Sequence, residues 1–102
     1  MADLTLKDSE QKYLEFTIKD SNGNQIDLSG CSVTLQVQKY GESSLAINSP
    51  CEVISPSDGK VRYLYEGELT PGHYRAELEV YDGSNILYIT KTFTIKVEGE
   101  IK

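Results

Sequence analysis

One segment, residues 69–81, constrains the fold of this chain more than any other part of the sequence. It reads Leu-Thr-Pro-Gly-His-Tyr-Arg-Ala-Glu-Leu-Glu-Val-Tyr, a turn that leads directly into a strict alternation of apolar and polar residues. Successive side chains of a β-strand point to opposite faces of the sheet, so this alternation predicts a strand with one buried face. The predicted inward residues are Tyr74, Ala76, Leu78 and Val80, and the predicted outward residues are His73, Arg75, Glu77, Glu79 and Tyr81. We expect this segment to form a central strand of a sheet.

The turn before this strand carries a second signal. Its Leu-x-Pro-Gly-x-Tyr pattern resembles the tyrosine corner of Greek-key sandwiches, in which a Tyr at the start of one strand bonds back to the preceding connection. Tyr74 occupies that position. We therefore expect its hydroxyl to donate a hydrogen bond to the backbone of the loop that precedes it.

Turn signals recur along the chain about every 8 to 12 residues, the spacing typical of an all-β sandwich. The clearest signals are Asn22-Gly23, Asp58-Gly59 and residues 82–85, and no window keeps helical spacing of apolar residues. The longer predicted strands cover residues 13–19, 31–39, 60–65, 73–81 and 86–97, with shorter pieces at 4–6, 26–28, 45–47 and 51–54. The sequence therefore predicts an all-β, immunoglobulin-like Greek-key sandwich of roughly seven or eight antiparallel strands.

The last predicted strand, residues 86–97, contains an irregularity. Five apolar residues share one parity and are predicted to point inward, namely Leu87, Ile89, Phe93, Ile95 and Val97. Lys91 has the same parity, which would bury a charge, and the segment is longer than the ~5–6 residues usual for a strand. We expect a bulge or bend at Lys91.

Length and composition limit the classes of function. With 102 residues, the chain has room for one domain, which we place at residues 1–102, with 98–102 as a linker or frayed tail. No apolar run approaches the ~20 residues that span a bilayer, so no membrane contact is expected. The net charge of -6, without a basic cluster, disfavours nucleic acid as a partner. The first residues, Met-Ala-Asp-Leu-Thr-Leu-Lys, do not form a signal peptide, so we expect the protein to be made in a cytoplasm.

Cys31 and Cys51 are the only cysteines. Two thiols without a histidine partner or a Cys-x-x-Cys spacing do not make a zinc site. Each shares inward parity with an apolar neighbour, Cys31 with Val33 and Cys51 with Val53. Two alternatives remain open: both are small buried hydrophobic residues in reducing surroundings, or they form a bridge between adjacent strands.

Four stretches, taken together, resemble a known family. They are residues 16–24, 26–33, 58–61 and 71–77, which read Phe-Thr-Ile-Lys-Asp-Ser-Asn-Gly-Asn, Ile-Asp-Leu-Ser-Gly-Cys-Ser-Val, Asp-Gly-Lys-Val and Pro-Gly-His-Tyr-Arg-Ala-Glu. Their order is similar to that in the amino-terminal immunoglobulin-like domain of the baseplate upper protein family of tailed phages of Gram-positive bacteria. The resemblance covers nearly the whole chain, and residues 92–97 suit the last strand of that domain.

This resemblance implies a structural part of a virion. A domain of this family is expected to dock on other phage tail or baseplate proteins, to help carry host-receptor-binding components, and to be part of a homo-oligomer in the full assembly. It would be made in the bacterial cytoplasm and located in the virion. The chain is either one domain of a longer protein or a free-standing relative with another docking role.

The candidates for catalysis have simpler interpretations. His73 is the only histidine, no Gly-x-Ser-x-Gly elbow accompanies it, and its parity places it on the surface. Glu77 and Glu79 occupy successive outward positions, which predicts a solvated acidic stripe instead of a glycosidase pair. We therefore expect a non-enzymatic protein with no catalytic residues and no cofactor.

One stretch of oxygen-bearing side chains raises the question of a metal. Asp20, Asn22, Asn24 and Asp27 carry oxygen donors of the kind that Ca²⁺ prefers. The glycine is misplaced for an EF-hand, and no acid stands at the twelfth position of such a loop. A plain hairpin turn is the favoured interpretation, so we expect no metal site.

Three of the seven tyrosines have outward parity: Tyr13, Tyr81 and Tyr88. Tyr81 and Tyr88 lie on the two arms of one predicted hairpin, where aromatic side chains can pair across strands. Together the three are candidate partner-binding residues, so that docking would use a sheet edge and an outward aromatic face. The alternative function is a carbohydrate-binding module that uses the outward tyrosines of the final hairpin. The structural alternative is that the rings merely cover a sheet.

Overall fold

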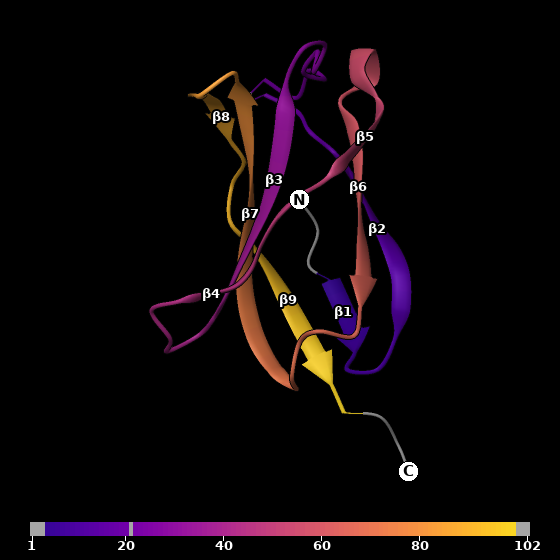
Figure 1. Cartoon of the computed structure of the whole chain (residues 1–102), viewed down its shortest axis with the longest axis vertical. Coiled ribbons are helices and arrows are strands. Elements are labelled where there is room, and N and C mark those ends of the chain that lie inside the picture. Colours follow the sequence, from indigo (N-terminus) through magenta and orange to yellow (C-terminus); the bar gives the residue numbers. More distant parts are fainter. Residues whose placement is uncertain (1–3, 21, 100–102) are drawn as a thin grey trace.

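The computed structural model describes residues 4–20 and 22–99, which contain nine strands and one short 3-10 turn (Figure 1). The strands are β1 (Leu4–Lys7), β2 (Gln11–Thr17), β3 (Ser32–Lys39), β4 (Leu45–Pro50), β5 (Glu52–Ser55), β6 (Lys60–Glu66), β7 (Gly72–Asp82), β8 (Asn85–Ile89) and β9 (Phe93–Glu98). The 3-10 turn η1 covers Pro56–Asp58. Within the described ranges, no helix is long and apolar enough to cross a membrane.

The strands form two sheets that face each other (Figure 1). The larger sheet has the order β1-β9-β7-β3-β4, with β8 also paired to β7, and the smaller sheet has the order β2-β6-β5. The predicted all-β sandwich is confirmed. One pair differs from the prediction, because β1 runs parallel to β9 whereas the other pairs are antiparallel. The strand orders are consistent with immunoglobulin-like connectivity, which stays a prediction.

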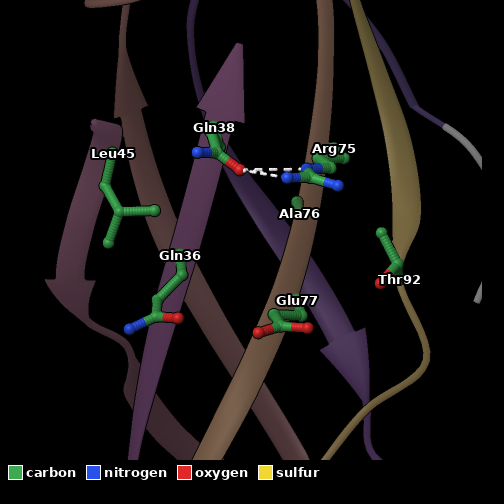
Figure 2. A pocket seen from close by; sticks show the side chains of 7 residues that line it. All are labelled: Gln36, Gln38, Leu45, Arg75, Ala76, Glu77 and Thr92. Carbon is green, nitrogen blue, oxygen red and sulfur yellow. Dashed lines mark hydrogen bonds between the residues drawn. The ribbon is translucent and has the colours of Figure 1, made fainter. Parts of the chain in front are cut away.

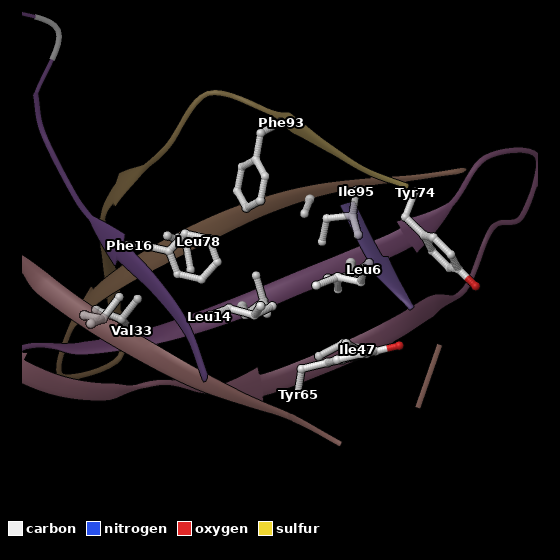
Figure 3. Packing of buried hydrophobic residues seen from close by; sticks show 14 of the residues in the cluster. Leu6, Leu14, Phe16, Val33, Ile47, Tyr65, Tyr74, Leu78, Phe93 and Ile95 are labelled. Carbon is white, nitrogen blue, oxygen red and sulfur yellow. The ribbon is translucent and has the colours of Figure 1, made fainter. Parts of the chain in front are cut away.

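The core lies between the two sheets and is built from their inward rows (Figure 3). Phe16 of the smaller sheet meets Phe93 of the larger sheet, with ring centroids 5.5 Å apart. Leu35 and Leu78, opposite each other on β3 and β7, are completely buried. Burying one such side chain stabilises a fold by about 2 kcal/mol, so these rows hold the two layers together.

β7 forms the predicted central strand, paired with β3 on one side and with β8 and β9 on the other. Its predicted inward residues, Tyr74, Ala76, Leu78 and Val80, are all buried. The Tyr74 hydroxyl donates a 2.7 Å hydrogen bond to the carbonyl oxygen of Thr70. The predicted tyrosine corner is therefore confirmed, and it fixes the loop before β7 to the start of the strand.

The predicted turn at Asp58-Gly59 is confirmed as the end of η1. Gly59 has a φ of 69°, a left-handed conformation that suits glycine. Its carbonyl accepts a hydrogen bond from the amide of Ile18 at 2.8 Å. A Cβ atom at Gly59 would lie 2.7 Å from the carbonyl oxygen of Ile18, so the backbone leaves no room for a side chain.

Residues 26–28, predicted as a short strand, follow an irregular path instead. The only pairing near them in the described chain is an isolated bridge between Lys19 and Gln25. Leu28 is nevertheless buried, and its amide donates a 2.8 Å hydrogen bond to the carbonyl of Pro56. A backbone hydrogen bond to η1, instead of strand pairing, therefore holds this segment where Leu28 joins the core.

The predicted bend at Lys91 is confirmed, because β8 ends at Ile89 and β9 begins at Phe93. Thr90 fills the gap between the two strands. The Leu78 amide donates to Thr90 Oγ1 at 2.9 Å, and the Thr90 amide donates to the Leu78 carbonyl at 3.0 Å. Thr90 thus keeps β7 paired where β8 stops.

The predicted orientation of β8 is wrong. The β7–β8 register shifts between Val80 and Tyr81, so that Ile86 lies opposite Tyr81 and Tyr88 lies opposite Val80. One residue of β8, Leu87, is therefore extra, and it reverses the alternation of the strand. The inward parity of Phe93, Ile95 and Val97 holds in β9, but Leu87 and Ile89 are exposed.

Cys31 and Cys51 are free thiols, each partly buried and packed against the core. The predicted small hydrophobic role fits both, although neither is fully buried, and the alternative bridge is not formed. Burial raises the pKa of the Cys51 thiol to about 12.

Of the predicted tail, Glu98 still belongs to β9, and its carbonyl accepts the Asp8 amide at 3.0 Å. Residues 100–102 lie outside the described residues.

Candidate docking surfaces

The three tyrosines predicted to bind partners lie in three different environments. Tyr13 is exposed on the outer face of the smaller sheet. Tyr81 is partly exposed on the outer face of the larger sheet, and Tyr88 is partly buried against the core. The structure therefore brings none of the three together on one surface.

Tyr13 belongs to a group of large side chains on the outer face of the smaller sheet. It lies directly opposite Leu64 on β6, and the Arg62 guanidinium lies 4.1 Å from the centroid of its ring. Ile54 adds a further apolar side chain on β5. The exposed fractions are 48% for Tyr13, 45% for Ile54 and 41% for Leu64. We call Tyr13, Ile54, Arg62 and Leu64 the small-sheet patch.

The charge in the small-sheet patch is held in place. Arg62 Nε donates to Glu52 Oε1 at 2.6 Å, and this hydrogen bond raises the pKa of the Arg62 guanidinium. The guanidinium over the Tyr13 ring is a cation–π contact. A guanidinium held against the exposed ring of Tyr13, with Leu64 opposite that ring, gives a surface of defined shape, which suits a protein partner.

The outer end of β7 carries Tyr81 and Glu79. The Tyr81 hydroxyl donates to Glu79 Oε1 at 2.9 Å, and this bond raises the pKa of Tyr81. Glu79 is only 7% exposed, so the predicted solvated acidic stripe is wrong at this residue. The apolar side chain of Ile89 lies opposite Glu79 on β8, and the Tyr81 hydroxyl is bonded to the Glu79 carboxylate. These two neighbours shield Glu79 from solvent.

Tyr88 lies on the opposite face of the larger sheet from Tyr81, because it is paired with the buried Val80. Tyr88 was predicted to point outward and Leu87 inward, and both predictions are wrong because the extra residue in β8 reverses its alternation. Tyr88 lines an open cleft between the sheets together with Thr17, Lys19 and residues of the 20–24 turn. Tyr81 and Tyr88 therefore do not form a joint aromatic platform.

A shallow hollow of about 170 Å³ lies on the outer face of the larger sheet (Figure 2). It is lined by Gln36, Gln38, Leu45, Arg75, Ala76, Glu77 and Thr92. Arg75 donates to Gln38 Oε1 from Nε at 2.9 Å and from Nη2 at 2.7 Å. Arg75 and Gln38 therefore engage each other at the floor of the surface that the hollow occupies.

The predicted hairpin turn after Asp20 is confirmed in its described residues, although residue 21 lies outside them. Asp20 Oδ1 accepts the amides of Asn22 at 2.9 Å and Asn24 at 3.0 Å. Asp27 Oδ1 likewise accepts the amide and the hydroxyl of Ser29. These carboxylates therefore serve as turn residues. In the described ranges, no group of three His, Cys, Asp or Glu residues is arranged to hold a metal ion.

The side chain of His73 is exposed on the surface, as the sequence predicted.

Sequence reasoning missed the neighbours of Tyr13 in the small-sheet patch. Leu64 and Arg62 have outward parity in the sequence, but their place beside Tyr13 depends on the pairing of β2 with β6. Ile86, Leu87 and Ile89 on β8 are also exposed, by 53%, 57% and 43%. No local signal marks the bulge that turns β8 outward.

A comparison with known families bears on the whole chain. The BppU N-terminal domain family matches residues 2–102. This chain belongs to that family. The predicted resemblance to the amino-terminal domain of the phage baseplate upper protein is therefore confirmed. This BppU N-terminal domain has a structural role in a phage baseplate, with a virion-associated location, and the family suggests interaction with other phage tail proteins.

The fold of this BppU N-terminal domain is also seen in a solved structure. It is similar to the N-terminal domain of phage TP901-1 ORF48, with a TM-score of 0.74 and 16% sequence identity. The similarity covers 93% of this chain and 83% of that chain. At this identity the likeness supports the fold alone. No curated protein sequence matches the chain.

Proposed function

We propose that this chain is a non-enzymatic adaptor that docks through the small-sheet patch onto another protein of the phage baseplate. In the assembled tail it would help to carry components that bind the host receptor. The observation that carries the proposal is the small-sheet patch, in which the exposed side chains of Tyr13 and Leu64 lie opposite each other and the Arg62 guanidinium is held by Glu52 and the Tyr13 ring. Membership of a baseplate family makes another tail protein the expected partner.

The chemistry of the patch suits a protein partner. Tyrosine and arginine are enriched among the residues that dominate interface energies, because they offer large contact areas and polar tips. The net charge of -6 makes nucleic acid an unsuitable partner for this domain. The expected contact is therefore an apolar side chain of the partner over Tyr13 and Leu64, with an acceptor facing Arg62.

The alternative function, a carbohydrate-binding module, is less well supported. Such a module would use Tyr81 and Tyr88 as one platform, but they lie on opposite faces of the sheet. Tyr81 also has its hydroxyl engaged by Glu79. A sugar surface on the final hairpin would therefore have to work with a single ring.

The test is co-expression of the chain with the other baseplate proteins of the same phage, followed by size-exclusion chromatography and titration calorimetry of each complex. The double variant Tyr13→Ala with Leu64→Ala is expected to weaken the complex by about tenfold or more. The matched control is Tyr40→Ala, because Tyr40 is also exposed but lies outside the patch. Equal affinity of all three proteins would contradict docking through this patch.

A second assay addresses the alternative directly. Cell-wall polysaccharide of the host is offered to the chain on an array, with Tyr88→Ala as the comparison. Binding that is lost in this variant would support the carbohydrate module. Binding to a baseplate protein with no response to polysaccharide would support the adaptor.

A further inference from the structure

The open cleft beside Tyr88 gathers side chains from both sheets. Lys19 follows β2 of the smaller sheet, Tyr88 belongs to β8 of the larger sheet, and Lys91 lies in the bend between β8 and β9. The cleft has a volume of about 480 Å³, against about 170 Å³ for the hollow around Arg75. We call it the lysine cleft, because a lysine from each sheet lines it.

The two lysines of the cleft have no partner for their charge. Among the described residues, neither Lys19 nor Lys91 forms an ion pair or a side-chain hydrogen bond. Lys12, by contrast, lies 3.5 Å from a carboxylate oxygen of Glu10. The lysine cleft therefore presents two ammonium groups that are available to a ligand.

The acidic side chain in the cleft is occupied by its own turn. Asp20 Oδ1 accepts the amides of Asn22 and Asn24. Two lysines and one aspartate among the described lining residues leave a local charge of +1. Salt screens charges that are more than ~10 Å away at about 0.1 M, so these lining charges count for more than the net charge of the chain. A local charge of +1 matches a carboxylate better than a phosphate monoester, which carries about -1.5 to -2 at pH 7.

The uncharged groups of the lysine cleft also suit a carboxylate. The hydroxyls of Thr17 and Tyr88 have no hydrogen-bond partner within the described part of the chain. Thr90 Oγ1 accepts the Leu78 amide, which leaves its O–H free to donate. Hydroxyl and ammonium donors make short, strong hydrogen bonds to a carboxylate, and the ring of Tyr88 can pack on the carbon atoms that carry it.

The backbone holds the two lysines in place before any ligand arrives. Lys19 forms an isolated bridge with Gln25. Thr90, the residue before Lys91, is bonded to Leu78 through both its amide and its side chain. Groups that are already positioned cost less entropy when a ligand binds.

We propose that the lysine cleft binds the carboxylate of an aspartate or glutamate side chain from a partner protein. The partner class rests on the proposed function, because a tail protein is the expected docking partner of this baseplate domain. The site itself shares no residue with the small-sheet patch. The two surfaces would therefore hold different parts of the partner.

The first experiment is an NMR titration of the isotope-labelled full chain with a blocked peptide that carries one glutamate among glycines. The amide signals of Lys19, Tyr88 and Lys91 are expected to shift and to saturate at millimolar peptide. The same peptide with glutamine in place of glutamate is expected to bind at least about threefold more weakly. Equal binding of the two peptides would overturn the proposal.

The second experiment locates the site by substitution. Lys19→Gln and Lys91→Gln are each expected to weaken binding of the glutamate peptide by about threefold, since each removes one ion pair. Lys96→Gln is the matched control, because it removes the same charge from β9 outside the cleft. An equal loss in the control would mean that net charge alone attracts the peptide, which would overturn the site.

Two further comparisons separate this proposal from its alternatives. Inorganic phosphate is expected to bind more weakly than the glutamate peptide, and tighter binding would overturn the assignment to a carboxylate. The double variant Tyr13→Ala with Leu64→Ala is expected to bind the peptide as the unchanged chain does. Failure of docking through the small-sheet patch therefore appears in the baseplate complex of that variant, whereas failure of the lysine cleft appears in the peptide titration. A baseplate complex unaffected by Lys19→Gln with Lys91→Gln would overturn the assignment to the docking partner.

Discussion

The hydroxyl of Tyr74 donates a hydrogen bond to the carbonyl oxygen of Thr70, four residues earlier in the chain, at 2.7 Å. Tyr74→Phe keeps the buried ring but removes this bond. The free energy of unfolding is expected to fall by about 1 kcal/mol, as measured by urea denaturation. Tyr40→Phe is the control, because Tyr40 is exposed and should tolerate the change. Equal stability of both variants and the unchanged chain would mean that the corner does not stabilise the fold.

Gly59 and Gly83 both have left-handed backbones, with φ of 69° and 63°. A Cβ at Gly59 would lie 2.7 Å from the Ile18 oxygen, whereas a Cβ at Gly83 would meet nothing within 4 Å. Gly83→Ala is expected to lower stability by about 1 kcal/mol, from backbone strain alone. Gly59→Ala adds a steric clash and is expected to lower stability by about 2 kcal/mol more. Urea denaturation of the two variants side by side measures the difference.

The side chain of Thr90 accepts a hydrogen bond from a β7 amide just beyond the end of β8. Its Oγ1 accepts the amide of Leu78 at 2.9 Å in a buried position. Thr90→Val keeps the shape but leaves that amide without its acceptor, so stability is expected to fall by about 2 kcal/mol. Thr90→Ser keeps the hydroxyl and is expected to lose less than half as much. Hydrogen exchange at the Leu78 amide should be faster in the valine variant than in the serine variant, and the reverse order would refute this role.

The raised pKa of the Cys51 thiol predicts that the folded protein loses stability at alkaline pH. Burial raises its pKa from the ordinary value of 9.0 to about 12. Since the folded-state pKa is above the unfolded-state value, the thiol's contribution to stability is complete below pH 9.0 and is lost progressively toward about pH 12. Burial also raises the pKa of Tyr65, which acts in the same direction. Urea denaturation at several pH values should show a shallower decline for Cys51→Ala than for the unchanged chain, and parallel declines would contradict the assignment.

Sequence patterns predicted the parts of this fold that depend on local chemistry. The alternation before Tyr81 and the Pro-Gly turn before Tyr74 are each contained in a few consecutive residues, and both were correct. The bend at Lys91 was also predictable, because a charge at an inward position conflicts with a continuous strand. These features follow from the chain itself and need no knowledge of which strands are neighbours.

The errors concern features that arise only when strands pair. The extra residue Leu87 reverses the faces of β8, and nothing in the residues 85–89 marks it. Glu79 becomes buried because Ile89 and Tyr81 surround it. The small-sheet patch likewise requires β2 to pair with β6, from distant parts of the sequence. Tyr13 was a candidate from the sequence, but its neighbours were not.

The parallel pairing of β1 with β9 affects how the domain responds to stretching. Leu4 lies opposite Ile95 and Lys7 lies opposite Glu98, so the two strands run in the same direction. Tension that pulls Leu4 and Glu98 apart along the strand axis therefore acts in shear. The hydrogen bonds between β1 and β9 must then break together, whereas a hairpin pulled at its open end would lose its hydrogen bonds one after another.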